Sequence, residues 1–251
     1  MGKTGPVSGQ QAGPTSATPA STAPWGYGPN DGPCCWGTLD PAFSVCALGK
    51  AQSPIDLTGG QWADLTPIEF DYRRTRIVVE NTGHTIQMTP EPGNGIVVDG
   101  AYHELLQFHF HHRSEHLFDG TGFPLELHLV HRNDDGGLAV IGILVAQGEA
   151  NNALAPSWAQ FPADSGTPRA VAEELDLASL LPSFGTTWRY MGSLTTPPCT
   201  EGVAWIIPFE TLSMSAAQID AFAAIHPHNC RPVQPLGERI LYRGCPPCPD
   251  R

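Results

Sequence analysis

Residues 107–112 read QFHFHH, a run in which histidines alternate with aromatic side chains. Alternate side chains of a β-strand point to the same face, so Gln107, His109 and His111 would lie together. On a helix the two histidines would instead point roughly 200° apart. The aromatic composition is typical of strands. The run therefore predicts a strand that directs two imidazoles to one side of a sheet.

A second run, ELHLVH (126–131), shows the same alternation and places Glu126, His128 and Val130 on one face. If the two predicted strands are neighbours, His128 joins the histidine pair of the first strand. Three neutral histidine nitrogens are the ligand set of a catalytic zinc whose fourth position is left to water. The two runs together predict a Zn²⁺ site.

Two polar residues support a metal site over a purely structural one. Gln107 and Glu126 each precede a candidate ligand by two residues on its own face. There, an amide oxygen or a carboxylate can accept the second ring N–H and fix the tautomer. His112 and His131 point to the opposite face and His103 lies outside the pair, so we interpret these three as structural or surface groups.

Length and charge limit the partners. The chain has 251 residues, 13 basic and 25 acidic, with a net charge of -12. This charge disfavours nucleic acid and anionic membranes as partners. No apolar run approaches the length of a membrane span, and the N-terminus lacks a signal-peptide pattern. We expect a small or neutral partner.

The chain divides into one domain and two tails. Residues 1–24 consist almost wholly of Gly, Pro, Ser, Thr, Ala and Gln and are predicted to be disordered. The domain is expected over residues 25–244, followed by a Cys/Pro-rich tail over 245–251. It should be mainly β, with short peripheral helices. We expect strands at 76–81, 95–100 and 138–146, and helices at 170–181 and 215–225.

Seven cysteines, at positions 34, 35, 46, 199, 230, 245 and 248, favour an oxidising compartment. The odd number leaves at least one thiol free or bonded to another chain. A single CxxC, Cys245 to Cys248, is a weak zinc signal, so disulfides are the favoured interpretation.

Several motifs resemble the α-class carbonic anhydrases, in the style of bacterial and algal members and over roughly residues 25–243. They are WGYG (25–28), QSPIDL (52–57), ENTGHTI (80–86), LLQFHFH (105–111), SEH (114–116), ELHLVH (126–131), LAVIG (138–142), GSLTTPPCTEGVAW (192–205) and NCRPVQPL (229–236). The resemblance implies a large, twisted, mostly antiparallel sheet with zinc at the bottom of a cone-shaped cleft. It also implies reversible hydration of carbon dioxide to bicarbonate, with sulfonamides and anions as inhibitors.

The resemblance also implies roles for individual residues. The hydroxyl of Thr195 would orient a zinc-bound hydroxide and donate its own proton to the carboxylate of Glu115. His84 would carry protons to buffer, and Asn229 would support the metal ligands. Carbon dioxide would rest against an apolar lining of Val130, Val140, Leu194, Val203 and Trp205.

By the same resemblance, Cys46 and Cys199 form a disulfide, and Ser53-Pro54 and Pro197-Pro198 are cis. The resemblance does not assign a pairing to the other five cysteines. Cys34 and Cys35 could link to the C-terminal CPPC, or one thiol could join two chains, so monomer and covalent dimer both remain. We expect a secreted, periplasmic or otherwise oxidising location.

Two other functions compete. His109, His111 and Glu115 also satisfy the cupin pattern for iron or manganese, although the cupin phrase Pro-x-Gly is missing around His128. A binding or matrix protein derived from an anhydrase is the other alternative. Such relatives usually lose a zinc ligand, and here all three histidines are present.

Overall fold

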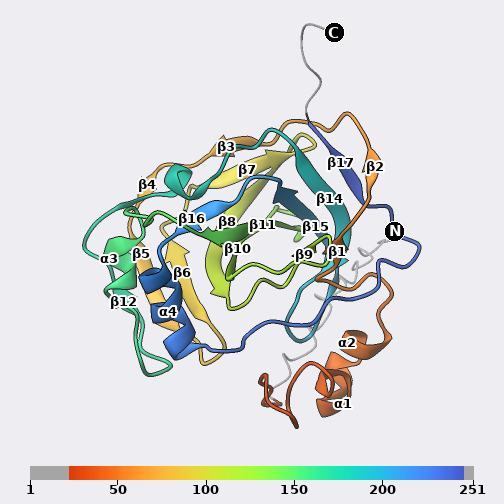
Figure 1. Cartoon of the computed structure of the whole chain (residues 1–251), viewed down its shortest axis with the longest axis horizontal. Coiled ribbons are helices and arrows are strands. Elements are labelled where there is room, and N and C mark those ends of the chain that lie inside the picture. The colour runs from red at the N-terminus through yellow and green to blue at the C-terminus, as the bar shows by residue number, and fades with distance from the viewer. Residues whose placement is uncertain (1–22, 246–251) are drawn as a thin grey trace, which may run out of the picture.

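The computed structural model describes residues 23–245 (Figure 1). Its strands are β1 (Asp56–Leu57), β2 (Gln61–Trp62), β3 (Glu69–Asp71), β4 (Arg74–Thr75), β5 (Ile77–Asn81), β6 (Ile86–Pro90), β7 (Gly95–Val98), β8 (Ala101–His111), β9 (Leu117–Phe118), β10 (Leu125–Arg132), β11 (Leu138–Gln147), β12 (Arg169–Ala170), β13 (Leu175–Asp176), β14 (Thr187–Ser193), β15 (Glu201–Pro208), β16 (Leu212–Met214) and β17 (Tyr242–Gly244). The helices are α1 (Trp36–Leu39), α2 (Val45–Leu48), α3 (Ala155–Trp158) and α4 (Ala216–Ile225), with 3-10 turns η1 (Pro41–Phe43) and η2 (Leu177–Leu180).

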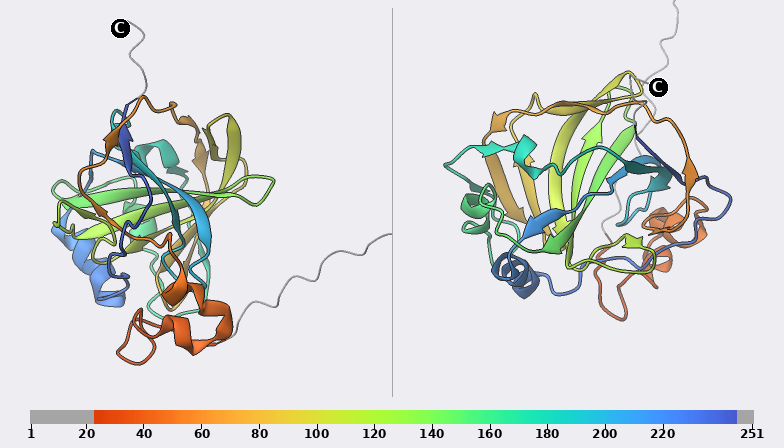
Figure 2. Two further views of the ribbon diagram at one scale, coloured as in Figure 1. Left: turned by 90° about the vertical axis from the view of Figure 1, so that its right-hand side faces the viewer. Right: turned by 45° about the horizontal axis from the view of Figure 1, so that its top comes forward.

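One large sheet dominates the described part of the chain. Its main path is β12-β5-β6-β8-β10-β11-β15-β14-β17-β2. Most pairs are antiparallel, and β11 with β15, β11 with β16 and β17 with β2 are parallel. The helices lie around the sheet, with α3 and α4 at one end and α1 and α2 below the other (Figures 1 and 2). The predicted mainly β fold with peripheral helices is confirmed.

The two histidine-bearing runs form adjacent central strands. β8 and β10 pair antiparallel, with His128 opposite His109 and Glu126 opposite His111. This register places the polar faces of both strands on the same side of the sheet, because directly paired residues share a face. The pairing on which the sequence argument depended is therefore present.

The opposite faces of these strands build the main core. Phe108, Phe110, Leu127 and Leu129 are fully buried there, together with Phe222 of α4. Burying each such side chain contributes roughly 1.5–3 kcal/mol. A register slip of one residue would expose this whole set, so the core fixes the register that brings the histidines together.

The predicted strands at 76–81, 95–100 and 138–146 are confirmed as β5, β7 and β11. The predicted helix at 215–225 is α4, which begins after a capping box in which Ser215 and Gln218 satisfy each other's backbone N–H groups.

The predicted helix at 170–181 is wrong. The segment forms the end of β12, then β13, then the short turn η2. Arg169 pairs with Val79 at the sheet edge, and the backbone N–H of Val171 donates to Ile77 O. The apolar residues bury themselves in the main core from this extended path, so edge pairing outweighed helix propensity.

The tails fall mostly outside the described residues, which exclude 1–22 and 246–251. Ala23 packs against the cluster around the buried Trp36. Within residues 23–245, no helix combines the length and apolar composition that a membrane span requires.

Cys46 and Cys199 form a disulfide, and Ser53-Pro54 and Pro197-Pro198 are cis, as the resemblance implies. A third cis bond joins His112 to Arg113. Cys34, Cys35, Cys230 and Cys245 are free. The suggested link from the Cys34-Cys35 pair to Cys245 is therefore not formed, and Cys248 lies outside the described residues.

His131 is a structural residue, as expected. Its Nδ1 donates to the backbone oxygen of Ala139 at 3.2 Å, so its Nε2 accepts from the hydroxyl of Tyr72 at 2.6 Å. Complete burial lowers the pKa of His131 to about 3. The folded protein therefore keeps this ring neutral at pH values where the unfolded chain protonates it.

This difference predicts acid destabilisation. Because the folded pKa of His131 is depressed, its contribution to stability is present above about pH 6.5 and is lost as the pH falls toward 3. Between pH 7 and pH 5, His131→Gln should lose about 2 kcal/mol less unfolding free energy than the parent protein. Urea unfolding at both pH values measures this, and equal losses in the two proteins would contradict it.

Candidate metal centre

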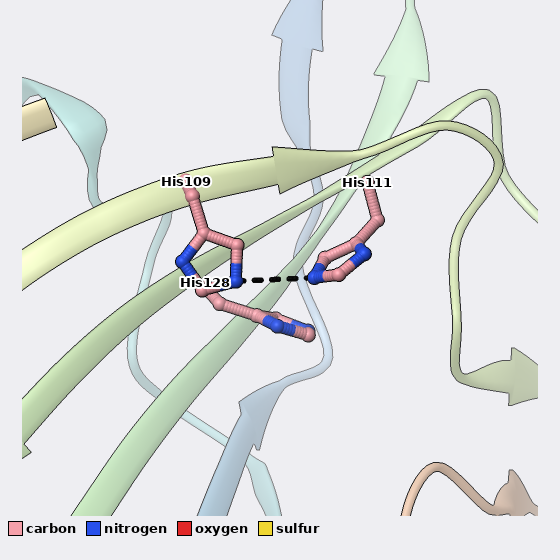
Figure 3. A group of neighbouring side chains, drawn as sticks. All are labelled: His109, His111 and His128. Atoms are coloured by element: carbon pink, nitrogen blue, oxygen red, sulfur yellow. Dashed lines mark hydrogen bonds between the residues drawn. The ribbon is translucent and has the colours of Figure 1, made fainter. Parts of the chain in front are cut away.

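Three imidazoles converge on the polar face of the sheet. His109 and His111 extend from β8 and His128 from β10, and their rings face one another (Figure 3). The Nε2 atoms of His109 and His111 are 3.1 Å apart, and one nitrogen from each ring lies within 4.8 Å of the others. His111 and His128 are buried and His109 is partly exposed. A small cation fits between these nitrogens.

The second nitrogen of each ring is held by an oxygen. His109 Nδ1 donates to Gln107 Oε1 at 2.8 Å, His111 Nδ1 to the backbone oxygen of Asn229 at 2.6 Å, and His128 Nε2 to Glu126 Oε1 at 2.8 Å. These oxygens can only accept, so the remaining nitrogens carry lone pairs. Lone pairs that face each other repel without a cation between them, and the donor set therefore fits a metal ion.

The charge state of the rings also suits a metal. Burial, followed by the repulsion of His111 and His128, holds the pKa of His109 well below its usual value. Burial lowers the pKa of His111 to about 4 and lowers that of His128 as well. All three rings are therefore neutral at pH 7, which metal ligation requires.

Glu115 places a buried carboxyl group beside the three rings. Its Oε1 accepts the backbone N–H of Arg231 at 2.7 Å. Its Oε2 has no hydrogen-bond partner within residues 23–245 and lies 3.5 Å from His111 Nε2 and 3.9 Å from His128 Nδ1. Burial raises the pKa of Glu115 to about 7, although His128, the Arg231 backbone and, to a smaller extent, Thr195 oppose this shift. A carboxyl group with one free oxygen therefore lies beside the facing lone pairs.

Glu126 does more than the sequence argument assigned to it. Besides the hydrogen bond from His128, its carboxylate accepts one from the ring Nδ1 of His116 at 2.7 Å. It also accepts hydrogen bonds from the backbone N–H groups of Glu115 and His116. Burial alone would raise its pKa, but His116 and His128 outweigh burial and hold the pKa well below its usual range. Glu126 is therefore a permanent buried anion that orients both the His128 ring and the Glu115 backbone.

His116 extends this network away from the centre. Its Nε2 lies 2.7 Å from the hydroxyl of Tyr190, which is 2.8 Å from Ser53 Oγ. These contacts give His116 a structural role. The role of Tyr190 was missed, because no local pattern places a strand residue 74 positions away against His116.

Arg231 was also missed, although it lies within NCRPVQPL. Its side chain is buried and donates to Gln52 Oε1, to the backbone oxygen of Ser53 and to that of Cys46. Its backbone N–H fixes Glu115. One residue thus ties the segment before β1 to the carboxylate beside the histidines.

The predicted apolar lining gathers beside the rings. Its five members, Val130, Val140, Leu194, Val203 and Trp205, belong to one hydrophobic cluster. Trp205 contacts the His128 ring, with centroids 4.9 Å apart. Val130 and Leu194 stay partly exposed. An apolar surface therefore adjoins the three imidazoles.

His84 lies apart from the three rings, in the turn between β5 and β6. It stacks on Trp25 with ring centroids 3.7 Å apart, and burial lowers its pKa while Asp31 opposes the shift. Trp25 and His84 both line a cavity of about 430 Å³, and Asn229 lines it as well. The Asn229 side chain donates to the backbone oxygen of His84, and its own backbone oxygen holds His111. Asn229 therefore connects the His84 turn to the centre.

Fold and site together define a mainly β metalloprotein with a three-histidine centre. The profile of the eukaryotic-type carbonic anhydrase family matches residues 31–244. A carbonic anhydrase of Pectobacterium carotovorum is 41% identical over 90% of this chain and 93% of its own. The α-carbonic anhydrase of Thermovibrio ammonificans, solved with the inhibitor sulfanilamide, superposes with a TM-score of 0.86 at 40% identity, covering 88% of this chain and all of that one.

The chain belongs to the eukaryotic-type, or α, carbonic anhydrase family, a class of metalloenzymes. The family match leaves the cupin interpretation without support. Another neighbour is dioscorin, solved in complex with ascorbate, with a TM-score of 0.83 at 29% identity over 89% of this chain and 99% of its own.

Proposed function

We propose that the protein catalyses the reversible, zinc-dependent hydration of carbon dioxide to bicarbonate and a proton. The observation that supports this is the set of three neutral imidazoles whose free nitrogens face one another while an oxygen holds each opposite nitrogen. Zinc in this family lowers the pKa of a bound water to about 7, a general property of carbonic anhydrases that supplies hydroxide at neutral pH.

In this proposal, His109, His111 and His128 hold the zinc. Glu115, which is held by the Arg231 backbone N–H, accepts a hydrogen bond from the hydroxyl of Thr195. The Thr195 oxygen is then left as an acceptor toward the centre, so it selects the orientation of whatever donates a proton there. The adjoining apolar cluster receives carbon dioxide, which carries no charge to be desolvated.

Removing the metal tests this proposal. After dialysis against a strong chelator, the protein should lose carbon dioxide hydration while staying folded. One equivalent of zinc should restore the activity. Stopped-flow hydration assays with metal analysis before and after measure both steps. Activity that survives complete removal of zinc would contradict the proposal.

His84 is proposed to carry protons between the centre and buffer, because an imidazole titrates near neutral pH. His84→Ala should reduce the hydration rate in dilute buffer by up to roughly 10²-fold, and added imidazole should restore much of it. The matched control is His112→Ala, which removes a partly exposed histidine whose ring is hydrogen-bonded to the backbone oxygen of Pro227. This variant should leave the rate unchanged. A normal rate for His84→Ala in dilute buffer would refute the assignment.

The likeness to dioscorin, which was solved in complex with ascorbate, favours a second candidate, a protein that binds a small organic molecule. The presence of the complete histidine set argues against it, since a binding protein has no need of three oriented neutral rings. A zinc-loaded sample that fails to hydrate carbon dioxide would favour this candidate.

Three further properties are part of the proposal. Sulfonamides and small anions are expected to inhibit, as the sulfanilamide complex of the Thermovibrio protein suggests. The Cys46–Cys199 disulfide is consistent with an oxidising compartment, and we propose a secreted or periplasmic location. Monomer and dimer both remain compatible with the described residues.

A further inference from the structure

Two adjacent cysteines lie immediately before α1, away from the metal centre. Cys34 is exposed, Cys35 is partly exposed, and neither belongs to a disulfide. Their Sγ atoms are 3.3 Å apart, and Cys35 Sγ also reaches the backbone oxygen of Pro29 at 3.7 Å. Two thiols in contact at the surface have no part in the proposed hydration reaction.

The geometry points to a thiol–disulfide exchange site, in which Cys34 and Cys35 are oxidised to a vicinal disulfide by small-molecule disulfides and reduced again by small thiols. This inference goes beyond the proposed function and does not depend on it. The sulfur atoms need only a small approach from their observed contact to reach a bond length near 2.05 Å.

The exchange proceeds in two balanced steps. The Cys34 sulfur, as its thiolate, attacks one sulfur of the small disulfide and expels the other half as a thiolate, which leaves a mixed disulfide. Cys35 then loses its proton to solvent, attacks the Cys34 sulfur and expels the second small thiolate. Two protein thiols are oxidised and one disulfide is reduced to two thiols.

The accessibility and hydrogen bonding of the two sulfurs support this order. Cys34 is the more exposed, so a small molecule reaches it first. The hydrogen bond with Cys34, with smaller effects of burial and of Asp31, raises the pKa of Cys35. The more exposed Cys34 is therefore assigned the first attack, and Cys35, in contact with it, the second.

The resulting bond should be easier to reduce than the structural disulfide. Neighbouring Cα atoms lie about 3.8 Å apart, below the usual 4.4–6.8 Å for bonded cysteines. Cys46 and Cys199 have Cα atoms 5.0 Å apart and are buried. A strained, exposed bond is reduced first, so the two disulfides should open at different concentrations of reductant.

Oxidised glutathione is the probe for the test, applied to the full chain. Cleavage before aspartate releases residues 31–39, DGPCCWGTL, which contain no cysteine besides the pair. In the parent protein this peptide should lose two hydrogen atoms and carry no glutathione. In Cys35→Ser it should carry one glutathione. Cys230→Ser, which removes a partly buried single thiol, is the matched control and should match the parent.

Three results would overturn the inference. They are a peptide that stays reduced, a stable glutathione adduct in the parent protein, and a cross-link from either cysteine to another peptide. A dithiothreitol titration of the oxidised parent gives an independent measurement that needs no variant. The pair should return to thiols while Cys46–Cys199 is still bonded, and the reverse order contradicts the inference.

Discussion

Replacing His128 with alanine is expected to abolish zinc binding and, with it, carbon dioxide hydration. Within the three-histidine set, His128 is the member that β10 supplies, and it faces two rings that both come from β8. Without it, His109 and His111 offer two nitrogens 3.1 Å apart, and the third imidazole of the set is lost. Two imidazoles do not make the three-ligand set of a catalytic zinc. The hydration rate should fall by roughly 10³-fold or more, because zinc supplies several kcal/mol of the rate acceleration.

The matched control is again His112→Ala, which removes a histidine next to the same β8 run but on its other side. Zinc content after dialysis and stopped-flow hydration should be measured on both variants. His112→Ala should retain close to one zinc per chain. Urea unfolding of the metal-free proteins shows whether the loss in His128→Ala is local. Full zinc content in His128→Ala would refute the ligand assignment.

The strand pair could be predicted because its signal is local. The period of two in QFHFHH and ELHLVH places each histidine on a face without reference to the rest of the chain. The core then supports this reading, because Phe108 and Leu129 on the opposite face are fully buried. The prediction of a helix at 170–181 was wrong because the signal there is not local. The path of this segment is decided by pairing with β5, a distant strand that no local window contains.

The supports of the site were only partly predictable. Gln107 and Glu126 were found because each lies two residues from its histidine on the same strand. Arg231 and Tyr190 were not, because they act across separations of 116 and 74 residues. Asn229 supports His111 through its backbone oxygen, a contact that the identity of the side chain cannot reveal.

The buried charges explain why such distant residues are needed. Glu115 and Glu126 are both fully buried, and an isolated carboxylate there would be strongly destabilising. Glu126 is stabilised by four donors, whereas Glu115 Oε2 has none within residues 23–245. The oxygen without a donor therefore lies nearest the three histidines, where the proposed hydrogen bond from the Thr195 hydroxyl would satisfy it.

Removing the Cys46–Cys199 disulfide is expected to produce the largest loss of stability. The bond joins α2 to the loop that follows Thr195, across a separation of 153 residues. Closing a loop of this length in the unfolded chain is worth roughly 5 kcal/mol in the chain-entropy model. The double variant Cys46→Ser/Cys199→Ser should therefore lose up to about 5 kcal/mol of unfolding free energy.

Activity should suffer less than stability in this variant. The Thr195 loop is also closed by backbone bonds from Leu194 to Thr200 and from Cys199 to Thr196, which the substitutions leave in place. The backbone oxygens of Cys46 and Cys199 also keep their donors, Arg231 and Gln52. These bonds hold the loop in the folded protein, whereas the disulfide acts mainly by restricting the unfolded chain.

Urea unfolding of the parent and the double variant, with and without dithiothreitol, separates these effects. Reductant should shift the parent curve toward that of the variant and leave the variant curve in place. Cys230→Ser controls for the loss of a thiol and should change the unfolding free energy by less than about 1 kcal/mol. If the double variant loses no more stability than Cys230→Ser, loop closure is not what the disulfide contributes. The bond would then matter only for the position of the Thr195 loop, and hydration rates would fall while stability did not.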